Sequence, residues 1–154
     1  MAKATPVPGI RAGASLRSNA RRVVIGRLAD VLEWLPRTKD PEDRQGLHDF
    51  RIAVKRLRYA LEFLGPAFDN KTKAALKGCQ DLQEALGLVT DCDAFLARLG
   101  EHARLLRTES ERRGFDALRE RLEAQRRRRY REVLRRIEEL QIQALWSDLL
   151  RGLL

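Results

Sequence analysis

The chain has 154 residues and a mass of 17.7 kDa, which suits a single domain. Hydrophobic residues make up 44% of it, charged residues 34% and aromatic residues 6%, which argues against a β-sandwich, and no apolar run approaches the roughly 20 residues of a membrane span. Lys and Arg exceed Asp and Glu by nine and the sequence pI is near 10.4, so the chain should attract polyanions.

Two prolines, two glycines and no hydrophobic periodicity predict that residues 1–13 are a disordered lead-in. Residues 14–154 are predicted to form one helical domain, because they are rich in Ala, Leu, Arg and Glu and show no strand-like alternation. The first helix is expected over residues 15–35 and the second over residues 44–64, where a Gly-Pro pair ends it. The N-terminus lacks the apolar stretch of a signal peptide, so we expect a soluble, cytoplasmic protein.

Two shorter helices and one long helix are expected after the Gly-Pro pair, the fourth ending near residue 107 and the long one covering about residues 109–140. The expected boundaries are a cap at Asp69 or Asn70 before the third helix, its end near Gly87, and a cap at Thr90 or Asp91 before the fourth. The predicted fold class is therefore all-α, a four-helix bundle followed by a long Arg-rich C-terminal helix.

Cysteines and acidic residues do not indicate a metal site. Cys79 and Cys92 form no C-x-x-C pair and have no histidine cluster nearby, so both are expected to be small buried hydrophobic residues. Asp91 and Asp93 are expected to act as cap and dipole partners at a helix start. We expect no metal and no cofactor.

The second predicted helix is strongly amphipathic. At about 100° per residue, one stripe holds its apolar residues: Phe50, Val54, Leu57, Leu61 and Leu64. A neighbouring face gathers polar and charged residues: His48, Arg51, Lys55, Arg58, Tyr59 and Glu62. This face is either a solvated flank or a ligand-binding wall. Like charges one turn apart repel each other, which an anionic ligand would offset.

Two blocks of this sequence resemble the CHAD family, the conserved histidine α-helical domain. The first block, from His48 to Glu62, reads H-x-x-R-x-x-x-K-R-L-R-Y-x-L-E. The second, from Leu76 to Asp91, reads L-K-x-x-Q-D-L-Q-x-x-L-G-x-x-x-D. Together they cover about residues 47–99.

The resemblance implies an all-helical domain that binds inorganic polyphosphate through a basic cavity. Carried over residue by residue, the implied ligand contacts are His48, Arg51, Lys55, Arg56 and Arg58, with Lys73 and Lys77 weaker. His48 would be protonated by a bound anion, or else is an ordinary histidine that donates to a neighbouring helix. The resemblance further implies a cytoplasmic protein that associates with polyphosphate granules.

Family members usually carry two four-helix repeats, whereas this chain shows one that resembles the second. A single repeat would dimerise to complete the cavity or bind its ligand more weakly. The sequence contains no Gly-rich phosphate loop, no acid pair typical of a nuclease or phosphatase, and no nucleophile–base pair. We therefore expect a binding module that is not an enzyme.

The long C-terminal helix carries much of the positive charge. From Arg112 to Arg136 there are 11 arginines and four acidic residues, a net charge of +7. Arg126 and Arg129 occupy positions where the apolar stripe should continue, which is costly unless negative charge meets them. Either this stretch is solvated, or bound polyphosphate contacts both residues. The alternative function is nonspecific nucleic-acid binding by this helix, with nucleic acid otherwise a nonspecific competitor.

A homodimer is expected because the C-terminal region has more apolar surface than a monomer would cover. Part of this surface is the stripe on the long helix: Phe115, Leu118, Leu122, Val133, Ile137 and Leu140. The closing segment adds four further residues: Leu145, Trp146, Leu149 and Leu150.

Overall fold

The computed structural model describes residues 5–69, 71–140, 147 and 149–151. Its four long α-helices are α1 (Leu16–Trp34), α2 (Arg44–Leu64), α3 (Lys73–His102) and α4 (Glu109–Glu139). The described residues include no strand, so the predicted all-α class is confirmed. Short 3₁₀ turns connect the helices: η1 (Leu35–Lys39), η2 (Gly65–Phe68) and η3 (Ala103–Leu105).

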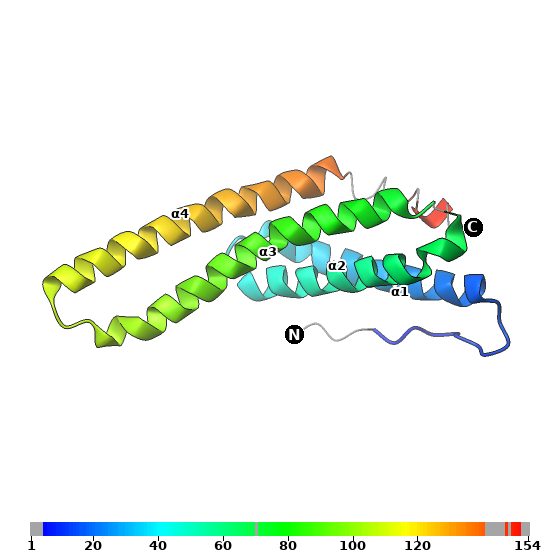
Figure 1. Ribbon diagram of the computed structural model, residues 1–154, viewed down its shortest axis with the longest axis horizontal. Helices are drawn as coiled ribbons and strands as arrows, with labels where there is room; N and C mark the ends of the chain where they lie inside the picture. The colour runs from blue at the N-terminus through cyan, green and yellow to red at the C-terminus, as the bar shows by residue number, and fades with distance from the viewer. Residues whose placement is uncertain (1–4, 70, 141–146, 148, 152–154) are drawn as a thin grey trace.

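Each helix packs against the next one along the chain. α1 and α2 form one pair, and α3 crosses over from α2 to pair with α4 (Figure 1). The end of α3 and the start of α4 project beyond the α1–α2 pair (Figure 1). The molecule is therefore a bundle at one end and a two-helix hairpin at the other.

The predicted break in the third helix is wrong, because α3 runs without interruption through Gly87. Packing accounts for the continuity. A methyl group added at Gly87 would stand 3.9 Å from the Arg51 guanidinium of α2, an ordinary van der Waals distance, so Gly87 faces α2. Thr90 and Asp91 are consequently interior residues of α3, where the Thr90 hydroxyl donates a 2.9 Å hydrogen bond to the Gly87 carbonyl.

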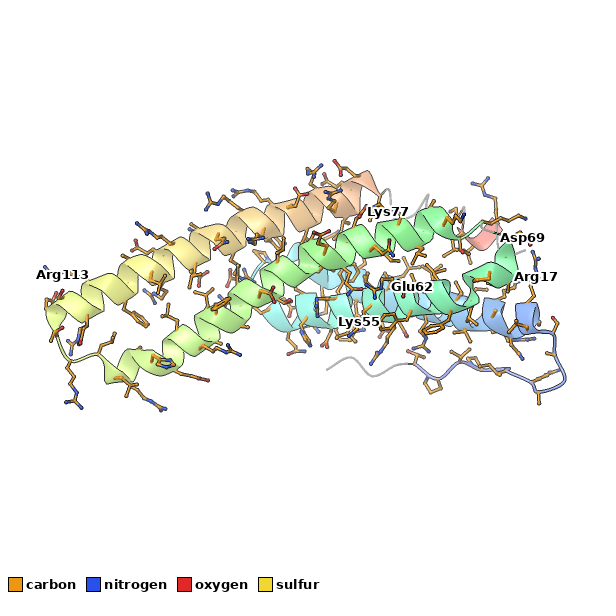
Figure 2. The ribbon with its side chains drawn as sticks, viewed as in Figure 1. Arg17, Lys55, Glu62, Asp69, Lys77 and Arg113 are labelled. Atoms are coloured by element: carbon orange, nitrogen blue, oxygen red, sulfur yellow. The ribbon has the colours of Figure 1, made fainter. Side chains whose placement is uncertain are left out.

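Capping residues account for the starts of α2 and α4. Asp43 caps α2 by accepting a 2.8 Å hydrogen bond from the Gly46 amide. Thr108 and Glu111 form a capping box at the start of α4. Asp69 does not cap α3: it follows η2 with a φ of +51°, and its carboxylate pairs with Arg17 at 3.3 Å (Figure 2). Asn70, the other expected cap, lies outside the described residues.

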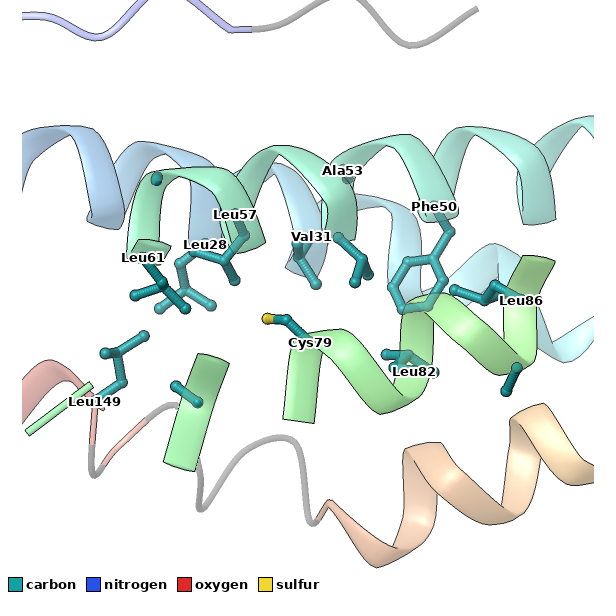
Figure 3. Packing of buried hydrophobic residues seen from close by; sticks show 14 of the residues in the cluster. Leu28, Val31, Phe50, Ala53, Leu57, Leu61, Cys79, Leu82, Leu86 and Leu149 are labelled. Carbon is teal, nitrogen blue, oxygen red and sulfur yellow. The ribbon is translucent and has the colours of Figure 1, made fainter. Parts of the chain in front are cut away.

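The core lies between α1, α2 and the first half of α3 (Figure 3), and Tyr130 and Val133 of α4 are buried in it as well. Val133, Ile137 and Leu140, which we expected to leave apolar surface uncovered, therefore pack against the monomer core. The apolar stripe predicted for α2 is buried there, with Leu64 at its edge. Cys79 and Cys92 are both buried free thiols, as predicted. Leu149, which we expected to add exposed apolar area, is buried in this core, while Leu145 and Trp146 lie outside the described residues.

The N-terminal lead-in, expected to be disordered, runs alongside α1 in its described residues (Figure 1). Asn19 Nδ2 donates a 2.8 Å hydrogen bond to the Arg11 carbonyl. Arg27 donates to the Thr5 carbonyl and forms a 2.8 Å ion pair with Asp30. These contacts tie the segment to the outer side of α1.

Candidate functional site

The basic face of α2, which we define as His48, Arg51, Lys55 and Arg58, flanks the buried stripe of the helix. Burial of Phe50, Leu57 and the rest of that stripe fixes the rotation of α2. The four basic side chains are then half-buried, at spacings of three, four and three residues. At 1.5 Å per residue they span about 15 Å along the helix axis.

Two arginines of this face lie at the seam between α2 and α3. The Arg51 guanidinium lies next to Gly87, and the charge of Arg58 acts on the buried thiol of Cys79. From Arg51 to Arg58 the residue numbers rise along α2, while their neighbours on α3 fall from Gly87 to Cys79. The two helices are therefore antiparallel. The basic face of α2 therefore forms one side of this seam, with α3 as the other.

The seam contains polar atoms that have no hydrogen-bond partner among the described residues. These are Nε of Arg51, Nε of Arg58 and Oε1 of Gln83 on α3, all of them buried. Arg58 Nε is 3.2 Å from Glu62 Oε1, an ion-pair distance, but the contact lacks hydrogen-bond geometry. A buried donor without an acceptor costs free energy, so an added oxygen atom at this seam would be stabilised.

Positive charge on this face is only partly neutralised. Among the described residues, the Arg58–Glu62 contact is the single ion pair of this face. Figure 2 shows where Lys55 and Glu62 lie on α2. Lys55 and Arg58 also lie over the ring of Tyr59, at 5.6 and 4.7 Å from its centroid. The result is a row of basic side chains along α2 whose positive charge is only partly offset by nearby acidic groups.

The other basic residues expected at the site are not gathered on this wall. Arg56 lies on the opposite flank of α2, in a shallow groove of about 420 Å³ toward α1. Lys73 is exposed at the first turn of α3. Lys77 is also exposed, and its Nζ lies 2.5 Å from Asp81 Oδ1 (Figure 2).

Arg126 is part of the protein interior. Its side chain is 1% exposed, its Nε lies 2.6 Å from Asp93 Oδ1, and its Nη2 donates a 2.7 Å hydrogen bond to the Pro41 carbonyl. Asp93 supplies the negative charge that we expected from bound polyphosphate, and Arg44 lies 3.3 Å from the same oxygen. The Arg126 guanidinium is therefore inaccessible to a ligand in this structure, and Asp93 is an ion-pair residue inside α3 instead of a helix-start residue.

Arg129 lies apart from the basic face of α2 as well. It borders an apolar groove between α3 and α4, close to Cys92. Burial raises the pKa of the Cys92 thiol, and the nearby Arg129 charge partly opposes that shift. The sequence predicted that Arg126 and Arg129 both lie on a core-facing stripe. It did not show that Asp93, the acid that pairs with Arg126, comes from another helix.

The described residues contain no group of three or more His, Cys, Asp or Glu side chains positioned to share a metal ion. None of the helices in this part of the chain is sufficiently long and apolar to cross a bilayer.

Comparison with protein families matches residues 2–100 to the CHAD domain. The matched region includes α1, α2 and nearly all of α3, and hence the basic face of α2, whereas α4 lies outside it. No curated protein and no solved structure shows significant similarity to the chain.

Proposed function

Because this chain belongs to the CHAD family, we propose that it binds inorganic polyphosphate along the basic face of α2. Polyphosphate is a linear anion, so a row of basic side chains would match its shape better than a compact cavity would. Arginine engages phosphate oxygens through paired donors, and lysine acts as a point charge. The observation that carries the proposal is the buried, unpartnered Nε of Arg51, beside a face with a single ion pair among the described residues.

In this proposal Arg51 and Arg58 anchor the polymer at the α2–α3 seam. Their guanidinium groups would donate to phosphate oxygens, and an oxygen that reaches the Nε of Arg51 would give that buried donor an acceptor. Lys55 and His48 extend the row on the outer side of α2. The span of about 15 Å favours simultaneous contact with several phosphates over capture of a single one.

Arg56, Lys73 and Lys77 have a different role in this proposal. They lie off the seam, and Lys77 already pairs with Asp81. They would attract the polymer through space without fixing its position. We propose further that the chain binds without chemistry of its own, in the cytoplasm and at polyphosphate granules.

The second candidate function is nonspecific nucleic-acid binding by α4. It is favoured by the exposed arginines Arg127, Arg128 and Arg131, which form no ion pair within the described part of the chain. Phosphate contacts of this kind bind nucleic acid without reading its sequence. The two candidates use different helices and can be separated by mutation.

A competition titration tests both candidates. Labelled polyphosphate is displaced by RNA of matched total charge from the wild type, from Arg51→Ala/Lys55→Ala, and from the control Arg127→Ala/Arg128→Ala. Each double variant removes two positive charges, so a difference between them reports position. We expect polyphosphate affinity to fall about tenfold or more for the α2 variant, on the scale of charged hydrogen bonds, and about twofold for the control.

Equal losses in the two double variants would contradict a site on α2 and leave general charge attraction. Loss confined to Arg127→Ala/Arg128→Ala, with RNA displacing polyphosphate charge for charge, would favour the α4 candidate instead.

A further inference from the structure

The projecting ends of α3 and α4 form a hairpin that has an apolar groove along one side. We call residues 88–102 of α3 and 109–125 of α4 the distal hairpin. The groove has a volume of about 610 Å³, and its apolar lining comes from both helices: Leu88, Cys92, Phe95, Leu99, Leu118 and Leu122. Phe95 is 59% exposed and Leu118 is 48% exposed.

A pair of helices cannot bury such a surface alone. Two antiparallel helices cover only the seam between them, and most of the distal hairpin extends beyond the ends of α1 and α2 (Figure 1). The start of α2 reaches the base of the hairpin, where Arg44 pairs with Asp93 and Glu123. A contiguous exposed apolar groove rimmed by charged residues is typical of an interaction site. A partner of complementary shape is needed to cover the apolar groove of the distal hairpin.

Charge on the rim indicates what that partner is. Asp91 and Arg98 both border the groove on α3, seven residues apart, which is about 10.5 Å along the helix. Both side chains are exposed, and neither forms an ion pair within the described part of the chain. A partner with charges of only one sign would attract one of these two residues and repel the other. A partner that carries the same acid and base in reverse order would form an ion pair with each of them.

We propose that this partner is a second copy of the chain, docked groove to groove through the distal hairpins. The two α3 helices would run antiparallel about a twofold axis near Phe95, which lies between Asp91 and Arg98 in sequence. Each Asp91 would then face Arg98 of the other copy, and the four distal helices would enclose Phe95, Leu118 and Leu122 in a bundle.

Two further basic side chains, Arg129 and His102, also border the groove. Arg129 lies at the end near Asp91, and His102 lies at the end near Arg98, with its Nδ1 2.8 Å from the Arg98 carbonyl. The closing segment is the weaker candidate for an interface, because its Leu149 is buried in the monomer core. The inference does not rest on polyphosphate binding.

Light scattering and sedimentation of the full chain provide the first test. The wild type is expected at twice 17.7 kDa, and Phe95→Glu at 17.7 kDa. Phe63→Glu is the matched control, because Phe63 is 82% exposed on α2, away from the hairpin. The control is expected to keep the wild-type mass, and circular dichroism should show equal helix content in all three. A wild type that stays at 17.7 kDa at about 100 μM would overturn the proposal.

Charge reversal tests the antiparallel pairing itself. Asp91→Arg and Arg98→Asp are each expected to raise the dimer dissociation constant about tenfold, because each replaces two attractive contacts with two repulsive ones. The double variant Asp91→Arg/Arg98→Asp restores opposite charges and should return to within about threefold of the wild type. Single variants without effect, or a double variant as weak as the singles, would overturn the pairing.

Discussion

Arg126 of α4 and Asp93 of α3 form an ion pair at the junction of the bundle and the distal hairpin, with Arg126 Nε 2.6 Å from Asp93 Oδ1. The arginine is 1% exposed, and its Nη2 also bonds the Pro41 carbonyl in the loop before α2. One side chain of α4 thus connects α3 to the start of α2, at a position that would otherwise belong to the apolar stripe.

Removal of this arginine should destabilise the protein strongly. Arg126→Ala leaves the Asp93 carboxylate with only Arg44, at 3.3 Å, and opens a cavity in the interior. We expect the free energy of unfolding to fall by about 3 kcal/mol, the scale for removal of one partner of a buried pair. Urea denaturation measures it. The neighbouring exposed Arg127→Ala should change stability by less than about 0.5 kcal/mol, and an equal loss in both variants would contradict the buried role of Arg126.

Single substitutions should distinguish the two flanks of α2. Arg51→Ala is expected to weaken polyphosphate binding by about 1–3 kcal/mol, because its guanidinium is held at the α2–α3 seam. Arg56→Ala removes the same side chain from the same helix but on the flank toward α1, and should cost less than about 0.5 kcal/mol. Isothermal titration calorimetry gives both affinities. If the two variants bind equally well, the seam does not position the ligand.

Both thiols should resist modification in the folded protein. Burial raises the pKa of Cys79 to about 12, and burial also raises the pKa of Cys92. A raised pKa keeps a thiol protonated and unreactive at pH 8. We expect a thiol-specific reagent to label neither cysteine within minutes, and both in urea, as followed by mass spectrometry. Cys92 should react first on longer exposure, because it lies at the apolar groove whereas Cys79 is in the core.

Protonation of Asp43 at acid pH should lower the stability of the folded protein. The hydrogen bond from Arg37, and then the bond from the Gly46 amide, hold the pKa of Asp43 below its usual 3.8. A lowered folded-state pKa means that this stabilisation is present above pH 3.8 and is lost as pH falls through the folded-state pKa. Asp43→Asn keeps an oxygen acceptor for the cap but loses the charge. We expect its melting temperature to be lower than that of the wild type at pH 7.

The Asp43→Asn difference in melting temperature should narrow as the pH falls through the lowered pKa of Asp43, where the wild-type carboxyl becomes protonated. A difference that stays constant from pH 7 to pH 2.5 would assign the effect to cap geometry instead of charge.

Helix identity could be read from the sequence where the signals are local. The periodicity of α2 and the Gly-Pro pair after it predicted residues 44–64, the bounds that the structure has. The continuous passage of α3 through Gly87 could not be read in this way, because glycine is a weak local breaker and the surrounding helix is held by contacts with α2 and α4.

Residue types and their spacing determined by themselves that the chain is helical and basic, and two of its motifs resemble the CHAD family, whose model matches residues 2–100. Only the tertiary structure decided which cations remain available: Asp93 neutralises Arg126, Arg56 lies on the far flank of α2, and Arg51 keeps an unpaired buried donor. The physical reason is that a charge is satisfied by its nearest opposite charge in space. That neighbour comes from another helix, whose register depends on packing of the whole core and not on any local pattern.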